Sequence, residues 1–193
     1  MVSKYDHALW ELLLRHKADE LPCEIPLIIS NHENLRPVAD HFNIRFEVFP
    51  ITKDNKRQQE EKELQLMKSL NVELVVLARY MQIISDDFCN AYNYAVINIH
   101  HSFLPAFIGA KPYHKAHARG VKLVGATAHY ATAELDEGPI IEQDVARISH
   151  RNSVDDLLRK GRVLEREIIV RAVKAHLEDR ILVYENKCVV FGD

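Results

Sequence analysis

The sequence lacks the features that would place this chain in several broad classes of protein. Its three cysteines, Cys23, Cys89 and Cys188, are too scattered to predict a disulfide framework or a Cys-x-x-Cys metal site. No apolar run approaches the roughly 18 residues that cross a bilayer, and no signal peptide precedes the first helical pattern. The net charge of −3 gives no reason to expect nucleic acid or an acidic membrane as partner. We therefore expect a reduced, cytoplasmic protein without nucleic-acid or membrane partners.

Glycine-rich linkers, internal repeats and low-complexity segments are also missing, and 193 residues make one domain of ordinary size. No Gly-x-Ser-x-Gly elbow is present to hold a nucleophilic serine. A helical pattern begins near Asp6, so only Met1 and Val2 are left for the strand that should open such a chain. We expect this first strand to be truncated. The resulting gap should be covered by another subunit or by disorder, which favours a homo-oligomer.

Apolar residues alternate between strand-like runs and helical patterns along the chain. Strands are predicted at residues 22–30, 45–51, 72–78, 95–99, 121–132 and 140–148. Helices are predicted at residues 35–42, 55–70 and 114–119, and from an N-cap at Ser153 to about residue 177. Residues 57–63 are mostly charged and are interpreted as a solvated helix face, and residues 181–191 fit a hairpin. The pattern predicts an α/β fold with a Rossmann-like, mostly parallel twisted sheet and helices on both faces.

Residues 95–104 combine a β-branched apolar run, typical of a buried parallel strand, with polar side chains at its end. Asn98 and His100 are two residues apart, so an extended backbone directs both to the same face, and His101 to the other. Ligands bind at the carboxyl ends of strands in open α/β sheets. For this pair alone, a satisfied core histidine with a capping amide is an equal alternative.

A second polar group follows in the chain. His129 lies in the strand predicted at residues 121–132, and Asp136 lies in a loop constrained by Gly138 and Pro139. If the two strand exits are neighbours, an amide, an imidazole and a carboxylate converge. Such a trio can orient a carbonyl oxygen, stabilise an oxyanion and move a proton. No cysteine lies in this region, which favours direct attack by water or an amine over an acyl-enzyme.

Three motifs resemble those of the formyltransferase family that uses 10-formyltetrahydrofolate. They are Asn98-x-His100, Ser102-x-Leu104-Pro105, and His129 seven residues before Asp136-x-Gly138-Pro139-Ile140. The resemblance extends over nearly the whole chain. It implies the formyltransferase fold and a catalytic trio of Asn98, His100 and Asp136. It also implies that folate is bound by Met81, Gln82, Ile84, His129, Thr132 and Leu135.

Within that family, the sequence is similar to the formyltetrahydrofolate deformylases. Glycinamide ribonucleotide formyltransferases carry a glycine-rich phosphate loop where this chain has residues 3–7 without glycine, and commonly have proline in place of His101. The similarity implies hydrolysis of 10-formyltetrahydrofolate to formate and tetrahydrofolate, a step in one-carbon metabolism and purine biosynthesis. Folate would be the substrate, with no tightly bound cofactor. Deformylases normally begin with an ACT regulatory domain, which we expect to be absent from residues 1–193.

Three other interpretations stay open. Formyl transfer to an amine such as glycinamide ribonucleotide is the first, and a phosphate bound near Ser3 would favour it. A metal hydrolase is the second, suggested by His114-x-x-His117, but zinc sites usually need three protein ligands, and we expect no metal. A non-catalytic module kept for oligomerisation is the third. Arg79 is expected to be solvated, whereas Lys111 could be solvated or contact the glutamate tail of the folate.

Overall fold

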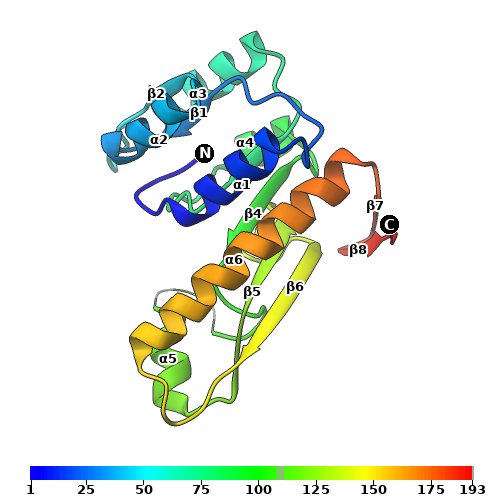
Figure 1. The fold of residues 1–193 in the computed structure, drawn as a ribbon. Helices are drawn as coiled ribbons and strands as arrows, with labels where there is room; N and C mark the ends of the chain where they lie inside the picture. The colour runs from blue at the N-terminus through cyan, green and yellow to red at the C-terminus, as the bar shows by residue number, and fades with distance from the viewer. Residues whose placement is uncertain (108, 110, 193) are drawn as a thin grey trace.

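The structure, a computed structural model, describes residues 1–107, 109 and 111–192. Its strands are β1 (Ile28–Ser30), β2 (Phe46–Val48), β3 (Val75–Leu77), β4 (Val96–His100), β5 (Leu123–Tyr130), β6 (Ile140–Arg147), β7 (Ile181–Tyr184) and β8 (Lys187–Val190). Its helices are α1 (His7–Lys17), α2 (Arg36–His41), α3 (Lys56–Ser69), α4 (Asp86–Ala91), α5 (Pro112–Arg119) and α6 (Val154–Leu177), with a short 3₁₀ helix, η1 (Glu33–Leu35), before α2. Figure 1 shows the long helix α6 beside the long strands β5 and β6.

The strands pair in parallel in the first part of the chain and antiparallel afterwards. β1 pairs with β2 and β3 with β4 in parallel, whereas β5 is antiparallel to both β4 and β6. Met1 and Val2 lie between β1 and β3. The Val2 amide donates to the Ile29 carbonyl at 2.8 Å, and the Ala78 amide donates to the Met1 carbonyl at 2.9 Å. These two residues therefore join the two groups of strands through backbone hydrogen bonds.

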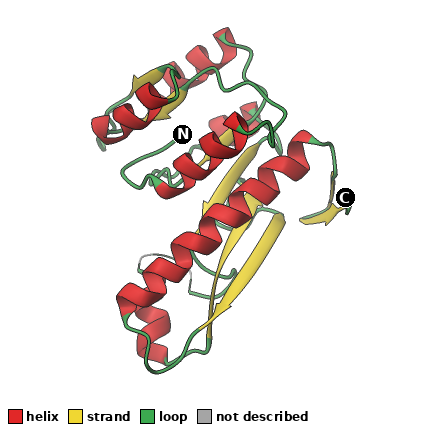
Figure 2. Cartoon of the chain, in the orientation of Figure 1, coloured by secondary structure: helices red, strands yellow, loops and turns green. Residues whose placement is uncertain are grey.

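Helices cover both faces of the sheet. Successive residues of a strand point to opposite faces, and two apolar clusters reflect this alternation. Ile97 belongs to the cluster that includes residues of α1, α2 and α6, and its neighbour Val96 belongs to the cluster that includes residues of α3 and α4. α6 packs on β4, β5 and β6 (Figure 2). The predicted α/β class with helices on both faces is confirmed, with β5 and β6 as its antiparallel part.

The helix α6 is 24 residues long and begins where the sequence predicted it. Ser153 is its N-cap: the Ser153 hydroxyl accepts from the Asp156 amide, and the Asp156 carboxylate accepts from the Ser153 amide. Ile168 and Ile169 are fully buried on the face that packs against the sheet. Within the described residues, no helix is long and apolar enough to cross a membrane.

The first strand after α1 is shorter than predicted. β1 begins at Ile28, although the apolar run begins near residue 22. Pro22 and Pro26 have no amide hydrogen and cannot donate to a ladder, which explains the shorter strand. The other predicted strands and helices are present with boundaries shifted by a few residues, including the hairpin of β7 and β8.

One interpretation of a helix face was wrong. Glu60 and Glu63 of α3 are 4 % and 0 % exposed, so the charged run is not simply solvated. Both have partners from other elements: the Ser85 amide donates to Glu60 at 3.1 Å, and the Tyr80 hydroxyl donates to Glu63 at 3.2 Å. Burial raises the pKa of Glu63 from 4.5 to about 7.

Candidate active site

The end of β4 brings Asn98 and His100 to one side of the sheet. β4 lies between β3 and β5, where its β-branched residues are buried on both faces. Asn98 is opposite His129 of β5, and His100 is opposite Thr127. Asn98 and His100 both line the same cavity, as their two-residue spacing predicted.

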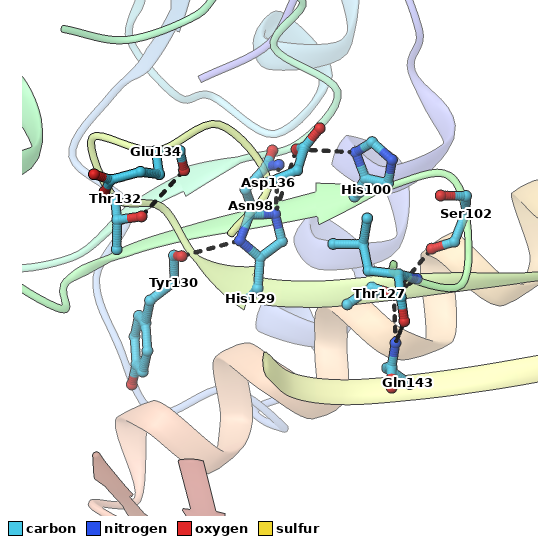
Figure 3. A network of polar contacts seen from close by, with 11 residues as sticks. Asn98, His100, Ser102, Thr127, His129, Tyr130, Thr132, Glu134, Asp136 and Gln143 are labelled. Carbon is cyan, nitrogen blue, oxygen red and sulfur yellow. Dashed lines mark hydrogen bonds and ion pairs between the residues drawn. The ribbon is translucent and has the colours of Figure 1, made fainter. Parts of the chain in front are cut away.

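Asp136 reaches His100 from the loop between β5 and β6. Its backbone is left-handed, with φ of +59°, a conformation that Asp adopts more readily than most residues. Two residues later the chain passes so close to β5 that a Cβ on Gly138 would lie 1.8 Å from the Tyr130 carbonyl oxygen. This close approach holds the loop against β5. It places the Asp136 Oδ1 atom 3.1 Å from His100 Nδ1 (Figure 3).

Hydrogen bonds fix the protonation of His129. Its Nδ1 lies 2.9 Å from the Tyr130 carbonyl oxygen, which can only accept, so Nδ1 carries the hydrogen. Its Nε2 then accepts from the Asn98 amide nitrogen at 3.1 Å. Burial lowers the pKa of His129, and the ring is only 2 % exposed. A neutral His129 therefore orients the Asn98 amide (Figure 3).

Asp136 is charged, in contrast to the neutral His129. Burial alone would raise the pKa of its carboxyl group, but the hydrogen bond from His100 and the imidazoles of His100, His129 and His101 lower it overall. Asp136 is therefore ionised at neutral pH and accepts from the Nδ1 hydrogen of His100. The second ring nitrogen, His100 Nε2, is buried and has no hydrogen-bond partner among the residues that the structure describes.

A second set of hydrogen bonds holds the loop that follows β4. The Thr127 hydroxyl donates to the Ser102 carbonyl at 2.9 Å and accepts from the Leu104 amide at 3.0 Å. Gln143 of β6 donates to the Leu104 carbonyl and to the Thr127 hydroxyl (Figure 3). The turn after His100 is thus attached to β5 and β6, which limits the movement of the imidazole.

The predicted site residues share one cavity, with a volume of about 680 Å³. Around the trio, it is lined by all the residues to which folate binding was assigned: Met81, Gln82, Ile84, His129, Thr132 and Leu135. Met81 and Leu135 are 51 % and 56 % exposed, so apolar surface is available to a ligand at the mouth. Pockets for small molecules are typically of this size and largely apolar, with a few polar groups that orient the ligand.

Two expectations about neighbouring residues were wrong. His101 lines the same cavity as His100, because β4 ends at His100 and the alternation of side chains ends with it. Burial and the charge of Arg79 lower the pKa of His101 to about 4. Arg79 is 8 % exposed rather than solvated, and its Nε lies 3.4 Å from Glu165 Oε2.

The sequence analysis missed the role of Glu165. It lies on the apolar face of α6, four residues after Gly161 and three before Ile168, and is 2 % exposed. An acidic residue on an apolar helix face was the signal that could have found it. Lys111, left open above, is exposed and lines the cavity. His114 also lines it, but no group of three or more potential metal ligands occurs among the described residues.

Comparisons with known proteins identify the family of this chain. Residues 1–173 match the formyl transferase family. The chain belongs to that family. A Synechocystis protein named formyltetrahydrofolate deformylase is 63 % identical over 191 residues, which cover 99 % of this chain and 67 % of that protein. A Bacillus subtilis protein of the same name is 52 % identical, with 99 % and 64 % covered.

Solved structures of formyl transferase family members have the same fold. The structure of a formyltetrahydrofolate deformylase from Pseudomonas syringae pv. tomato superimposes with a TM-score of 0.97 at 50 % identity, covering 100 % of this chain and 64 % of the other. A glycinamide ribonucleotide transformylase from Symbiobacterium toebii has a TM-score of 0.92 at 25 % identity, with 99 % and 92 % covered. This chain spans about two thirds of the length of the deformylases that it matches.

Proposed function

We propose that this chain hydrolyses 10-formyltetrahydrofolate to formate and tetrahydrofolate. The observation that supports this most strongly is His100: its buried Nε2 has no hydrogen-bond partner in the part of the chain that the structure describes, while its Nδ1 is held by an ionised carboxylate. A buried polar atom without a partner is costly, and the cavity beside it is where a substrate oxygen would satisfy it. The relatives at 63 % and 52 % identity carry the name formyltetrahydrofolate deformylase.

The reaction begins with water attacking the formyl carbon. The Asn98 amide donates one of its two N–H groups to His129, so the other N–H group can donate a hydrogen bond to the developing oxyanion. His100, protonated on both nitrogens, donates its Nε2 hydrogen to the same oxygen. Asp136 stabilises this imidazolium and takes the proton of the attacking water. Collapse of the tetrahedral intermediate breaks the bond between carbon and N10, and the proton passes to N10.

The folate lies between two loops, residues 81–84 and residues 132–136. A pterin has apolar faces and an edge rich in donors and acceptors. Met81 and Ile84 can pack against the faces, while backbone groups of the two loops bind the edge. The folate is a substrate in this scheme, and no tightly bound cofactor takes part.

Formyl transfer to glycinamide ribonucleotide is the alternative, because the transformylase fold is so similar. It would need a phosphate site in residues 3–7. Ser3 is 2 % exposed, and its hydroxyl donates to Asn31 at 2.7 Å and accepts from the Met81 amide at 2.9 Å. Because this hydroxyl makes both hydrogen bonds within the protein, it does not serve as a donor to a substrate phosphate. This favours hydrolysis over transfer to glycinamide ribonucleotide.

One assay tests the proposal. Purified protein is incubated with 10-formyltetrahydrofolate, with and without glycinamide ribonucleotide, and formate and tetrahydrofolate are measured. We expect equal amounts of formate and tetrahydrofolate at a rate that the amine does not change. Tetrahydrofolate that forms only with the amine, without formate, would identify a transferase instead.

We propose a cytoplasmic homo-oligomer of this single domain. Apolar side chains on and after β8 support the assembly, because Val189, Val190 and Phe191 are 47 %, 41 % and 54 % exposed. Sedimentation velocity tests it: a monomer at all concentrations would contradict the proposal.

A further inference from the structure

Glu165 of α6 is the centre of a buried cluster with side chains from α1, from α5 and from the segment that follows β3. His7 Nε2 of α1 lies 2.8 Å from Glu165 Oε2, and Arg79 Nε, after β3, lies 3.4 Å from the same oxygen. The Tyr113 hydroxyl of α5 donates to Oε1 at 3.2 Å. A charged group this deeply buried is stable only when it is paired.

The cluster holds one wall of the cavity in place. Tyr5, Arg79, His101 and Tyr113 line the cavity, and Glu165 stands behind them. The Arg79 guanidinium lies over the Tyr5 ring at 4.9 Å, and the His101 ring lies 6.3 Å from the Tyr113 ring. The wall also reaches the catalytic group, because the His101 and His100 rings are 5.2 Å apart.

Close packing fixes the position of Tyr113. A Cβ on Gly161 of α6 would lie 2.0 Å from the Tyr113 hydroxyl oxygen, so only glycine leaves room for the ring. Gly161 and Glu165 are one helical turn apart on α6. Gly161 leaves room for the Tyr113 hydroxyl, and Glu165 accepts the hydrogen bond from it. The ring is 4 % exposed and blocks that side of the cavity.

We propose that this wall, above all Tyr113 backed by Glu165 and Arg79, determines which acceptor reaches the formyl group. The inference rests on the proposed hydrolysis. With folate against residues 81–84 and 132–136, a nucleophile must approach the formyl group from the remaining side of the cavity. That side is closed by the wall residues Tyr5, Arg79, His101 and Tyr113. Water needs only about 30 Å³. An amine must also find room for the rest of its molecule. The same fold serves a transformylase at 25 % identity, so the fold alone does not determine the acceptor.

The test is how the formyl group partitions between water and a small amine. Wild type and variants receive 10-formyltetrahydrofolate with increasing glycinamide, and formate and formylglycinamide are measured by mass spectrometry. Wild type should form formylglycinamide only at the rate of the uncatalysed reaction. Tyr113→Ala removes the ring and leaves Glu165 paired with His7 and Arg79, and we expect its formylglycinamide fraction to rise at least about tenfold.

Two controls separate the wall from general damage. Tyr113→Phe keeps the ring and loses only the hydrogen bond to Glu165, so its partition should stay close to that of wild type. Arg162→Ala changes an exposed residue of the same helix and should alter neither rate nor partition. If Tyr113→Ala does not fold, Tyr113→Leu provides the same test, because it shortens the side chain and leaves Glu165 paired with His7 and Arg79.

The outcomes are distinct. A wild type that releases no formate overturns the proposed hydrolysis and this inference with it. A wild type that hydrolyses, together with a folded wall variant whose partition is unchanged, overturns the wall alone. Efficient formylation of glycinamide by the wild type would also overturn it. A higher formylglycinamide fraction in Tyr113→Ala, without the same increase in Tyr113→Phe, would support the proposed role of the wall.

Discussion

Replacing Asp136 by asparagine tests the proposed mechanism most directly. Asparagine is nearly the same size and adopts the left-handed backbone at φ +59° as readily as aspartate, so the fold should be retained. Alanine is a poorer choice, because the left-handed conformation costs it about 1–2 kcal/mol. The change therefore removes one negative charge and little else.

The size of the effect follows from the geometry. The Asp136 Oδ1 atom is 3.1 Å from His100 Nδ1, and the two side chains are 8 % and 7 % exposed. In a site with an effective dielectric constant of about 20, charges about 4 Å apart interact by roughly 4 kcal/mol. Loss of a general base lowers rates by about 10²–10⁴, and loss of one oxyanion donor by about 10²–10³. Because both effects act on one transition state, we expect Asp136→Asn to lower kcat about 10²- to 10⁴-fold.

Steady-state kinetics of tetrahydrofolate release, with kcat and KM measured separately, check this expectation. KM should change little, because the carboxylate acts on the transition state rather than on folate binding. Asp155→Asn, the same chemical change at an exposed position of α6, is the matched control and should behave as wild type. Wild-type hydrolysis by Asp136→Asn, or a loss confined to KM, would refute the mechanism.

Three further predictions concern other parts of the site and the core. Asn98→Ala should lower kcat at least about 100-fold, and its combination with Asp136→Asn should cost much less than the product of the two, as kinetics of the double variant would reveal. Met81→Asp should raise KM strongly by placing a charge against the pterin, and unchanged folate binding in a fluorescence titration would place the pocket elsewhere. Glu63 holds a proton in the folded protein between pH 4.5 and about 7 that the unfolded chain has lost, so the contribution of Glu63 to the free energy of unfolding should fall as pH rises through that window. The buried Met1 amine, with its pKa lowered from 8.0 to about 5, has the opposite effect. Glu63→Gln should remove the Glu63 contribution alone, about 3 kcal/mol at most, which the difference from wild type in urea unfolding from pH 4.5 to 7.5 would measure.

Local patterns in the sequence were sufficient to predict the fold class and to single out Asn98, His100, His129 and Asp136, whereas the other residues around the cavity came from the resemblance to the formyltransferase family. Asn98 and His100 share a face because strand alternation depends only on the two-residue spacing. The same argument was wrong for His101, because the strand ends one residue earlier and a periodic pattern does not mark that end. The strand at residues 22–30 was overextended for a related reason, since the two prolines outweigh the apolar run.

Contacts between distant elements could not be predicted in this way. Arg79 and Glu165 meet only once α6 is folded over the sheet, and a charged side chain in isolation is most often solvated. Glu63 was misinterpreted for the same reason: its partner Tyr80 is 17 residues away, beyond β3. Periodicity describes which side of a helix is buried, but the partners that stabilise a buried charge are a property of the tertiary structure.

The different roles of the two imidazoles beside Asp136 follow from one backbone carbonyl. His129 Nε2 is 3.8 Å from Asp136 Oδ1, so proximity alone would let this ring compete with His100 for the carboxylate. The Tyr130 carbonyl prevents this, because it accepts a hydrogen bond from Nδ1 of His129. The proton of the neutral ring is therefore on Nδ1, and Nε2 can only accept. His129 can therefore only orient Asn98, while His100, bonded to Asp136 through Nδ1, keeps Nε2 for the cavity. In the proposed mechanism, proton transfer therefore falls to Asp136 and oxyanion stabilisation to His100, and His129 contributes by holding the Asn98 amide in place.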